Sequence, residues 1–249
     1  MQIGTYDVAR IGLGTNRLRD TAEHVTFLRS AVEAGVQLVD TAHLYTSGES
    51  ERAVGNALSP VPDGCLVATK GGYGGARPDV LAAEIEESLK RLRTDRIGLY
   101  YLHRVDADVP LEDSLGAIRA YVDRGAIAHV GLSEVGVEQI ERGRAVVPIA
   151  AVQNHYNLTE RKHEAVVDHC EAQGIAFVPF FPLHGLDRPG VDAIARRHGA
   201  TPAQVALAWM LRRSPVMAPI PGTLSLAHVR EDLGALDVAL TDEDVAALR

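Results

Sequence analysis

The chain has 249 residues, of which 46% are hydrophobic and 23% are charged, and its formal net charge is -8. This size and composition are typical of one large globular α/β domain and argue against a disordered chain. The negative charge opposes nonspecific attraction to nucleic acid, and no stripe of Lys and Arg overrides it locally. We therefore expect no nucleic-acid partner.

The sequence also gives no sign of a membrane anchor or an export signal. It has no run of about 18 apolar residues, and its first residues lack the basic and then apolar pattern of a signal peptide. Cys65 and Cys170 lie far apart in apolar contexts, so reduced core thiols are expected rather than a disulfide. These features predict a cytoplasmic protein.

Short apolar runs alternate with longer amphipathic stretches along the chain, the pattern of a parallel sheet covered by helices. The first ten residues alternate around Gly4 and Asp7 and predict a small β-hairpin. Helical patterns follow, and Thr201 begins one with an N-cap, a proline at the first helical position and a capping glutamine. The predicted strands cover residues 9–14, 36–40, 65–70, 97–103, 126–133, 149–154, 175–181 and 215–220.

Eight strand–helix units in about 250 residues match a (β/α)8 TIM barrel in number and in length. We predict one α/β domain of this fold over residues 1–249, with the short N-terminal β-hairpin preceding the barrel. A doubly wound open sheet is the alternative.

Three consecutive predicted strands end on ionisable residues: Asp40, Lys70 and His103. In a TIM barrel the chemistry lies at the carboxyl ends of the strands, so these side chains are expected to face one another. Tyr45, in the loop after the second strand, can fold back over them. A nearby ammonium favours the ionised form of a tyrosine hydroxyl, and a carboxylate keeps a half-buried ammonium charged.

Such a group can donate a proton to a carbonyl oxygen, which is half of a carbonyl reduction. Each residue also has a structural interpretation, because Asp40 can brace a loop, Tyr45 can pack, Lys70 can be a solvated strand end and His103 can be a core imidazole. A purely structural barrel does not need complementary groups at three adjacent strand ends, so together they favour a catalytic site.

These residues resemble the aldo-keto reductase superfamily. The matching segments are VDTAHLYTSGESERAVGNAL, LVATKGG, LYYLHRVD and, further along, VGLSEV, AVQNHYNL and PIPGTLSLAHVREDL. The resemblance implies a TIM barrel that reduces aldehydes or ketones with NADPH. It also implies a catalytic tetrad of Asp40, Tyr45, Lys70 and His103, with Tyr45 as the general acid.

The same resemblance implies how the cofactor binds without a Rossmann domain. Ser133 and Gln153 would bind the nicotinamide amide and Phe180 would stack on its ring, while Leu183 and Gly185 would lie at the pyrophosphate. The adenosine end would meet a helix start, whose free N–H groups attract anions. The remaining expected cofactor residues are Gly14, Thr15, Asp40, Gly222, Thr223, Ser225, His228, Glu231 and Asp232.

The sequence departs from the family pattern in both subsites. Many relatives carry Lys and Arg for the 2′-phosphate where this chain has Gly222 and His228, so the positive charge at that position is reduced. NADPH is still expected from the resemblance, and NADH use stays open. Glu134 replaces a common asparagine after Ser133. Asn16 replaces a bulky aromatic, which predicts an open substrate pocket; its expected residues are Asn16, Tyr45, Tyr73, His103 and Arg104.

Two other functions compete with the reductase. One is a nicotinamide-binding redox sensor or auxiliary subunit with little turnover, since some members of the superfamily serve as channel subunits. The other is an aldolase in which Lys70 forms a Schiff base, a mechanism that requires a neutral amine. No metal-ligand spacing is found, so no metal is expected, and the sequence predicts neither the substrate nor the oligomeric state.

Overall fold

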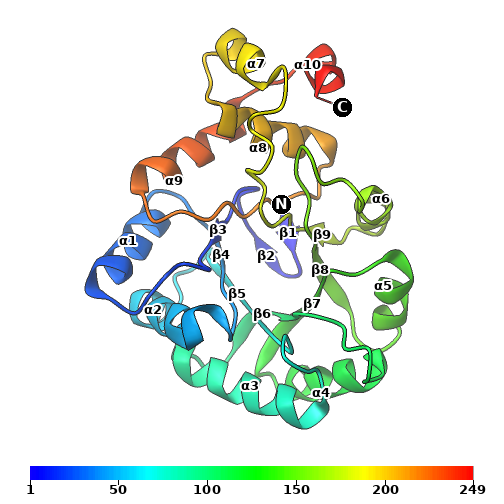
Figure 1. Ribbon diagram of the computed structural model, residues 1–249. Helices are drawn as coiled ribbons and strands as arrows, with labels where there is room; N and C mark the ends of the chain where they lie inside the picture. The colour runs from blue at the N-terminus through cyan, green and yellow to red at the C-terminus, as the bar shows by residue number, and fades with distance from the viewer. Residues whose placement is uncertain (249) are drawn as a thin grey trace.

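The computed structural model describes residues 1–248, which centre on a curled sheet of seven parallel strands (Figure 1). The strands neighbour one another in chain order, from β3 to β9, without the reversal of strand order that defines a doubly wound sheet. That alternative is therefore wrong. The strands are β3 (Leu13–Gly14), β4 (Leu38–Asp40), β5 (Leu66–Gly71), β6 (Ile97–Leu102), β7 (Ile127–Ser133), β8 (Ile149–Gln153) and β9 (Ala176–Phe177).

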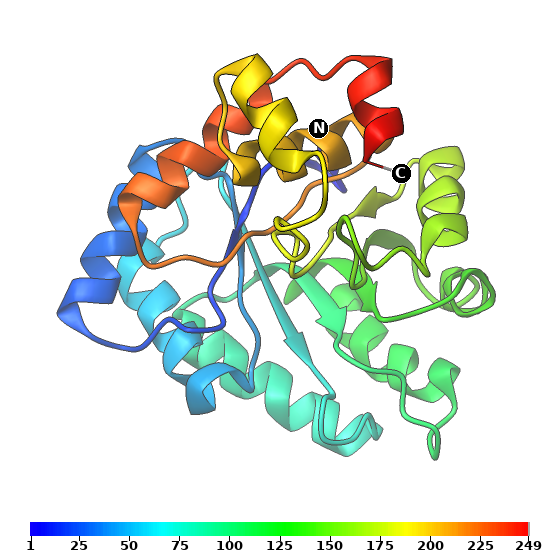
Figure 2. The same ribbon diagram turned by 45° about the horizontal axis from the view of Figure 1, so that its top comes forward.

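Helices surround the sheet on its outer side, and α7 to α10 gather at one side of the ring (Figures 1 and 2). The predicted start at Thr201 is confirmed, because its hydroxyl accepts from the Gln204 N–H while the Gln204 side chain accepts from the Thr201 N–H. The α-helices are α1 (Ala22–Glu33), α2 (Glu49–Leu58), α3 (Pro78–Leu92), α4 (Leu111–Asp123), α5 (Val137–Arg144), α6 (Glu164–Gln173), α7 (Val191–His198), α8 (Pro202–Arg213), α9 (Leu226–Leu233) and α10 (Asp242–Ala247). Two 3-10 helices are η1 (Tyr45–Gly48) and η2 (Gly234–Asp237).

The eighth predicted strand, residues 215–220, is not a regular strand in the structure. Its backbone nevertheless hydrogen-bonds on both sides: Ala218 N donates to Phe177 O at 2.9 Å, and Gly12 N donates to Pro219 O at 3.0 Å. Pro219 and Pro221 lack the N–H that would donate toward β3, so half of that ladder cannot form. The described residues therefore contain seven regular parallel strands, and the prolines explain why this segment does not form an eighth one of the same kind.

The predicted N-terminal hairpin is confirmed as β1 (Gln2–Ile3) and β2 (Tyr6–Asp7), which pair antiparallel. Ile3 packs in one buried cluster with residues that point to the inner side of the sheet, such as Leu66 and Leu99. A second, larger cluster lies between the sheet and the helices. The hairpin thus covers one end of the space inside the sheet.

Successive strand residues alternate between these two clusters, as the pleat requires. Leu66 and Ala68 of β5 belong to the inner cluster, whereas Val67 belongs to the outer one. Residue 70 of the same strand therefore continues the inner row. The same parity applies to Leu99, Tyr101 and position 103, so the strands deliver their last inner residues to one end of the sheet.

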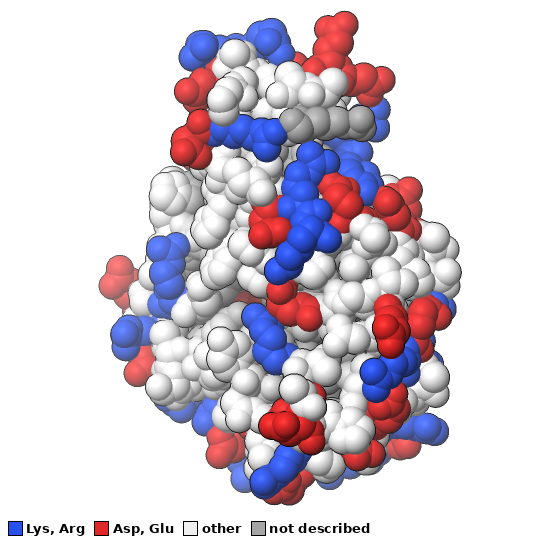
Figure 3. Space-filling model, turned by 45° about the vertical axis from the view of Figure 1, so that its right-hand side comes forward, with Lys and Arg blue, Asp and Glu red and all other residues white. Residues whose placement is uncertain are grey.

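The surface carries charges of both signs. On the face in Figure 3, Lys and Arg side chains are interspersed with Asp and Glu. Among residues 1–248, no helix combines the length and the apolar character needed to cross a membrane.

Candidate active site

The inner rows of five strands end in polar side chains. Asp40, Lys70, His103, Ser133 and Gln153 close β4 to β8, and all are buried, Lys70 with no exposed surface at all. Neighbouring strands lie about 4.8 Å apart, so the inner row of each strand brings its last side chain beside the next. The strand ends alone had predicted that Asp40, Lys70 and His103 meet, whereas Ser133 and Gln153 were expected only from the family resemblance.

Lys70 and Asp40 form the centre of the group. The Lys70 ammonium donates to Asp40 Oδ1 at 2.5 Å and to the Thr41 carbonyl at 2.7 Å, while the Gln153 amide donates to Asp40 Oδ2 at 2.8 Å. Burial alone would lower the pKa of Lys70, but the charge of Asp40 and the Tyr45 hydroxyl raise it above its ordinary value. Lys70 is therefore a charged ammonium.

Tyr45 reaches this pair from the loop after β4. Lys70 Nζ lies 3.3 Å from the Tyr45 hydroxyl and 4.9 Å from the centre of its ring. The loop bends sharply, since Thr46 and Ser47 have φ of 47° and 55°, and the Thr46 hydroxyl donates to Leu18 O at 2.8 Å. The half-buried tyrosine is thus held with its hydroxyl beside the ammonium.

A buried ion pair that the sequence did not predict supports this loop. Glu51 is fully buried and accepts from the Thr69 hydroxyl at 2.6 Å and from Arg91 at 3.3 Å. Arg91 also donates to His43 O at 3.2 Å, and a Cβ at Gly48 would lie 2.6 Å from its guanidinium carbon. Glu51, within the ESER segment, was the only sign of this ion pair in the sequence. Its contact with Arg91 joins α2 to α3 and therefore depends on the fold.

His103 lies on the other side of Tyr45, with ring centres 6.1 Å apart, and Tyr73 packs on it edge-on at 5.0 Å. Burial, with smaller contributions from Lys70 and Arg104, lowers the pKa of His103 to about 2. Its Nδ1 is buried without a hydrogen-bond partner. The imidazole is therefore neutral at physiological pH, and it can exchange hydrogen bonds with a ligand without carrying charge.

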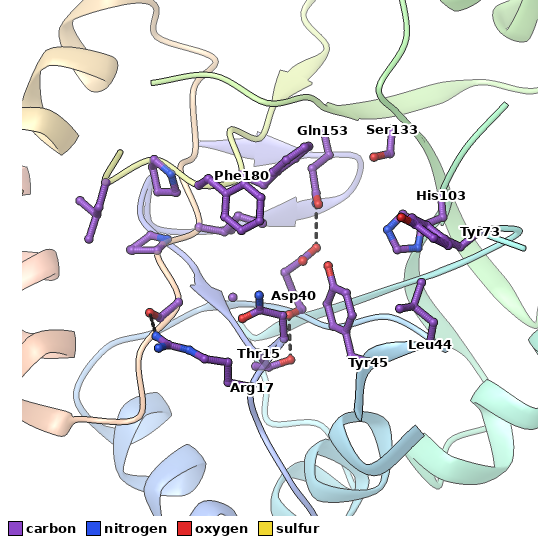
Figure 4. Close-up of a pocket in the computed structure, with 18 of the residues that line it drawn as sticks. Thr15, Arg17, Asp40, Leu44, Tyr45, Tyr73, His103, Ser133, Gln153 and Phe180 are labelled. Carbon is purple, nitrogen blue, oxygen red and sulfur yellow. Dashed lines mark hydrogen bonds between the residues drawn. The ribbon is translucent and has the colours of Figure 1, made fainter. Parts of the chain in front are cut away.

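A cavity of about 600 Å³ opens above these residues. Figure 4 shows Tyr45 with its hydroxyl directed into the cavity, near Asp40, and His103 with Tyr73 beside it. Lys70 lies beneath the wall rather than in it. The predicted site residues that line the cavity are Gly14, Thr15, Asn16, Asp40, Tyr45, Tyr73, His103, Arg104, Ser133, Gln153, Phe180, Leu183 and Gly222.

The other predicted cofactor residues lie beyond the cavity wall. Ser225 caps α9 through the His228 N–H, and Thr223 lies 3.2 Å from His228 Nδ1, so these three form one small cluster at the helix start. Glu231 instead accepts from the Thr201 hydroxyl at 2.6 Å, which turns its carboxylate toward α8. Gly185 has φ of 85°, and a Cβ there would lie 2.6 Å from Thr159, so both backbone and space require glycine.

Asp232 is buried within α9, with 5% of its surface exposed. Its burial, reinforced by neighbouring Glu231, raises the pKa of the carboxyl to about 7. Glu134 does not line the cavity, and its carboxylate accepts from the His155 N–H at 2.6 Å.

Several cavity residues were not predicted. Arg17 donates to the Gly222 carbonyl at 2.8 Å and links β3 to the segment after β9, while Phe181 stacks on His184 with ring centres 5.1 Å apart. No motif marks these positions, and their proximity arises only from folding. The unpredicted residues of the wall are Arg17, Leu44, Phe181, Pro182, His184, Ile220 and Pro221.

Comparison with known proteins assigns this arrangement to a class of oxidoreductases. A model of the aldo/keto reductase family matches residues 10–188 and 186–249. An uncharacterised oxidoreductase of Schizosaccharomyces pombe is 36% identical over all of this chain and 88% of its own length. Pyridoxine 4-dehydrogenase of Escherichia coli is 33% identical, covering 99% of this chain and 96% of the enzyme. The chain belongs to the aldo-keto reductase family.

Solved structures agree with the fold. A thermostable aldo-keto reductase, Tm1743, in complex with the inhibitor epalrestat, superposes with a TM-score of 0.92 at 29% identity, covering 100% of this chain and 97% of that one. An aldo-keto reductase of Klebsiella pneumoniae in complex with NADPH gives 0.88 at 30% identity, covering 97% and 90%. Both cover nearly the whole chain, so the family resemblance read from the sequence is confirmed.

Proposed function

We propose that this protein reduces aldehydes or ketones to alcohols with NADPH and that Tyr45 donates the proton. The observation that carries the proposal is the Tyr45 hydroxyl, 3.3 Å from an ammonium that Asp40 holds at 2.5 Å, in the wall of a cavity. The family membership and the relative that binds NADPH support the cofactor.

The cavity fits a nicotinamide cofactor. Gln153 and Ser133 place an amide and a hydroxyl in its wall, and Phe180 lines it while its ring stacks on His155 at 5.2 Å. Glycines at positions 14 and 222 let backbone approach closely, since their Cα atoms face each other across an isolated bridge. When bound there, reduced nicotinamide supplies the hydride; the chain's residues supply orientation and the proton.

The proton step follows from the electrostatics of the wall. As negative charge develops on the substrate oxygen, the Tyr45 hydroxyl donates its proton to it, and the adjacent Lys70 ammonium stabilises the phenolate that remains. Asp40 keeps Lys70 charged and fixed. His103, being neutral, hydrogen-bonds the same oxygen and orients the carbonyl rather than acting as the acid.

The competing functions receive less support. A Schiff base at Lys70 needs a neutral amine, whereas Asp40 raises its pKa and three groups occupy its donor positions. A sensor with little turnover does not need the complete tetrad.

We also infer that residues 216–222 close the sheet into an eight-stranded barrel, because their backbone hydrogen-bonds on both sides. Residues 1–249 act as one domain. The protein works in the cytoplasm, where its buried cysteines stay reduced.

The test is Tyr45→Phe, which removes only the hydroxyl. We expect kcat on a simple aldehyde to fall by about 10²–10⁴-fold while NADPH affinity, measured by fluorescence titration, is retained. Tyr121→Phe is the matched control, because its hydroxyl bonds the Ala82 carbonyl at 3.1 Å on the outer helices. Wild-type turnover in the Tyr45 variant would refute the role of this residue.

A further inference from the structure

The cavity is rich in positive charge and poor in negative charge. Asp40 is the only carboxylate among the described residues that line it, and Lys70 and Gln153 already occupy both of its oxygens. Two arginines line the same cavity, Arg17 and Arg104. A cavity of this kind favours a ligand with a negative charge beyond its reacting carbonyl.

Arg104 lies immediately after His103 and is held rigidly. Its Nη1 donates to the His103 carbonyl at 2.6 Å and to the Ser133 hydroxyl at 3.0 Å, so two adjacent strand ends fix the guanidinium. Tyr73 lies across it, 5.5 Å from ring centre to guanidinium carbon. Figure 4 places Ser133, His103 and Tyr73 together on one side of the cavity, away from Arg17.

The guanidinium of Arg104 has donors left over. It carries five N–H groups, and both of these hydrogen bonds come from Nη1. Within residues 1–248, Arg104 forms no salt bridge with any Asp or Glu. Arg124 and Arg142, by contrast, pair with glutamates on the outer surface. A half-buried, fixed and uncompensated guanidinium is suited to bidentate binding of a carboxylate.

We propose that Arg104 determines substrate specificity by binding a carboxylate on the carbonyl substrate, so the preferred substrates are aldehydes or ketones that carry an acid group. The inference rests on the proposed reductase function, because it needs a carbonyl between Tyr45 and His103. Arg17 does not share this role, since it lies at the opposite side of the cavity and donates to the Gly222 carbonyl.

The test compares 4-carboxybenzaldehyde with methyl 4-formylbenzoate, which has the same ring and aldehyde but no charge. With NADPH, we expect the wild-type kcat/KM for the acid to exceed that for the ester by about 10–100-fold, the effect of one charge-assisted hydrogen-bonded pair. Arg104→Gln, which keeps an amide donor and removes the charge, should bring this ratio close to one. Arg17→Gln, the matched control, should leave the ratio unchanged.

Other outcomes would overturn the inference. A wild-type ratio near one, with the ester reduced well, would reject the carboxylate site while leaving the reductase function intact. Arg104→Gln with an unchanged ratio and weakened NADPH binding would assign the guanidinium to the cofactor instead. Reduction of neither compound by a folded wild-type protein would reject the reductase function and the specificity site together.

Discussion

The two ends of the cavity are built differently. At the catalytic end, Asp40, Lys70 and His103 are buried at strand ends. The first two hydrogen-bond each other and are fixed further by the Thr41 carbonyl and the Gln153 amide. At the end near α9, the Thr223 hydroxyl lies 3.2 Å from His228 Nδ1 and accepts from the Ser225 N–H, and His228 is exposed. Preorganised charge favours catalysis, whereas an exposed helix start contributes weak, screened attraction.

The buried ion pair at the catalytic end also affects the stability of the folded protein. A buried ammonium must keep its carboxylate, because an ion left alone in the interior is strongly destabilising. Nothing comparable constrains the exposed end, so substitutions there should act on ligand binding alone. Variants that separate folding from binding therefore test whether the two ends differ as described.

The largest effect is expected from Asp40→Ala, which leaves the fully buried Lys70 ammonium without its carboxylate. We expect the free energy of unfolding, measured with urea, to fall by about 3–5 kcal/mol. Asp79→Ala is the matched control, since Asp79 pairs with Arg77 on the exposed surface and its loss should leave the free energy of unfolding nearly unchanged. Equal losses in the two variants would contradict the buried ion pair.

A second buried carboxyl, Asp232, sharpens the comparison because no cation pairs with it among the described residues. Its folded pKa of about 7 lies above the ordinary value for an unfolded aspartate, about 3.9. Its contribution to stability is therefore complete below about pH 4 and is lost as the pH rises toward about 7. Asp232→Asn should remove this loss and stabilise the protein at about pH 8 by on the order of 2–4 kcal/mol.

Urea unfolding of wild type and Asp232→Asn at about pH 5 and about pH 8 measures this difference. The stabilising effect of the substitution should be larger at the higher pH. A variant that is less stable than wild type at the higher pH would mean that Asp232 is ionised and paired in the folded protein.

The smallest effect is expected at His228. His228→Ala should weaken NADPH binding by less than about tenfold and leave NADH binding unchanged, because one exposed imidazole holds a 2′-phosphate more weakly than a bidentate guanidinium does. His228→Arg should tighten NADPH alone. Parallel fluorescence titrations check both, and equal changes for the two cofactors would exclude contact with the 2′-phosphate.

The catalytic end was also the part of the site that the sequence predicted best. Asp40, Lys70 and His103 end predicted strands, and the period of two in the pleat places them on one side, so their meeting followed from local pattern. The ion pair of Glu51 with Arg91 under the Tyr45 loop, and the contact of Arg17 with Gly222, join segments far apart in the chain. No local pattern carries such contacts.

Two further differences have identifiable causes. The last predicted strand has the right apolar residues, but Pro219 and Pro221 remove donors that a regular ladder needs. The residues expected at the adenosine end were read from a resemblance, and the fold turns Glu231 toward Thr201 and buries Asp232. Where side chains point from a helix depends on packing rather than on motif.

The most direct test of the account is to mix the purified wild-type protein with NADPH and methyl 4-formylbenzoate and to follow both the NADPH and the alcohol. We predict multiple turnovers with one alcohol formed for each NADPH consumed. Tight NADPH binding with no alcohol formed from this aldehyde or its acid would contradict the assignment of Tyr45, Lys70, Asp40 and His103 as a working reductase site.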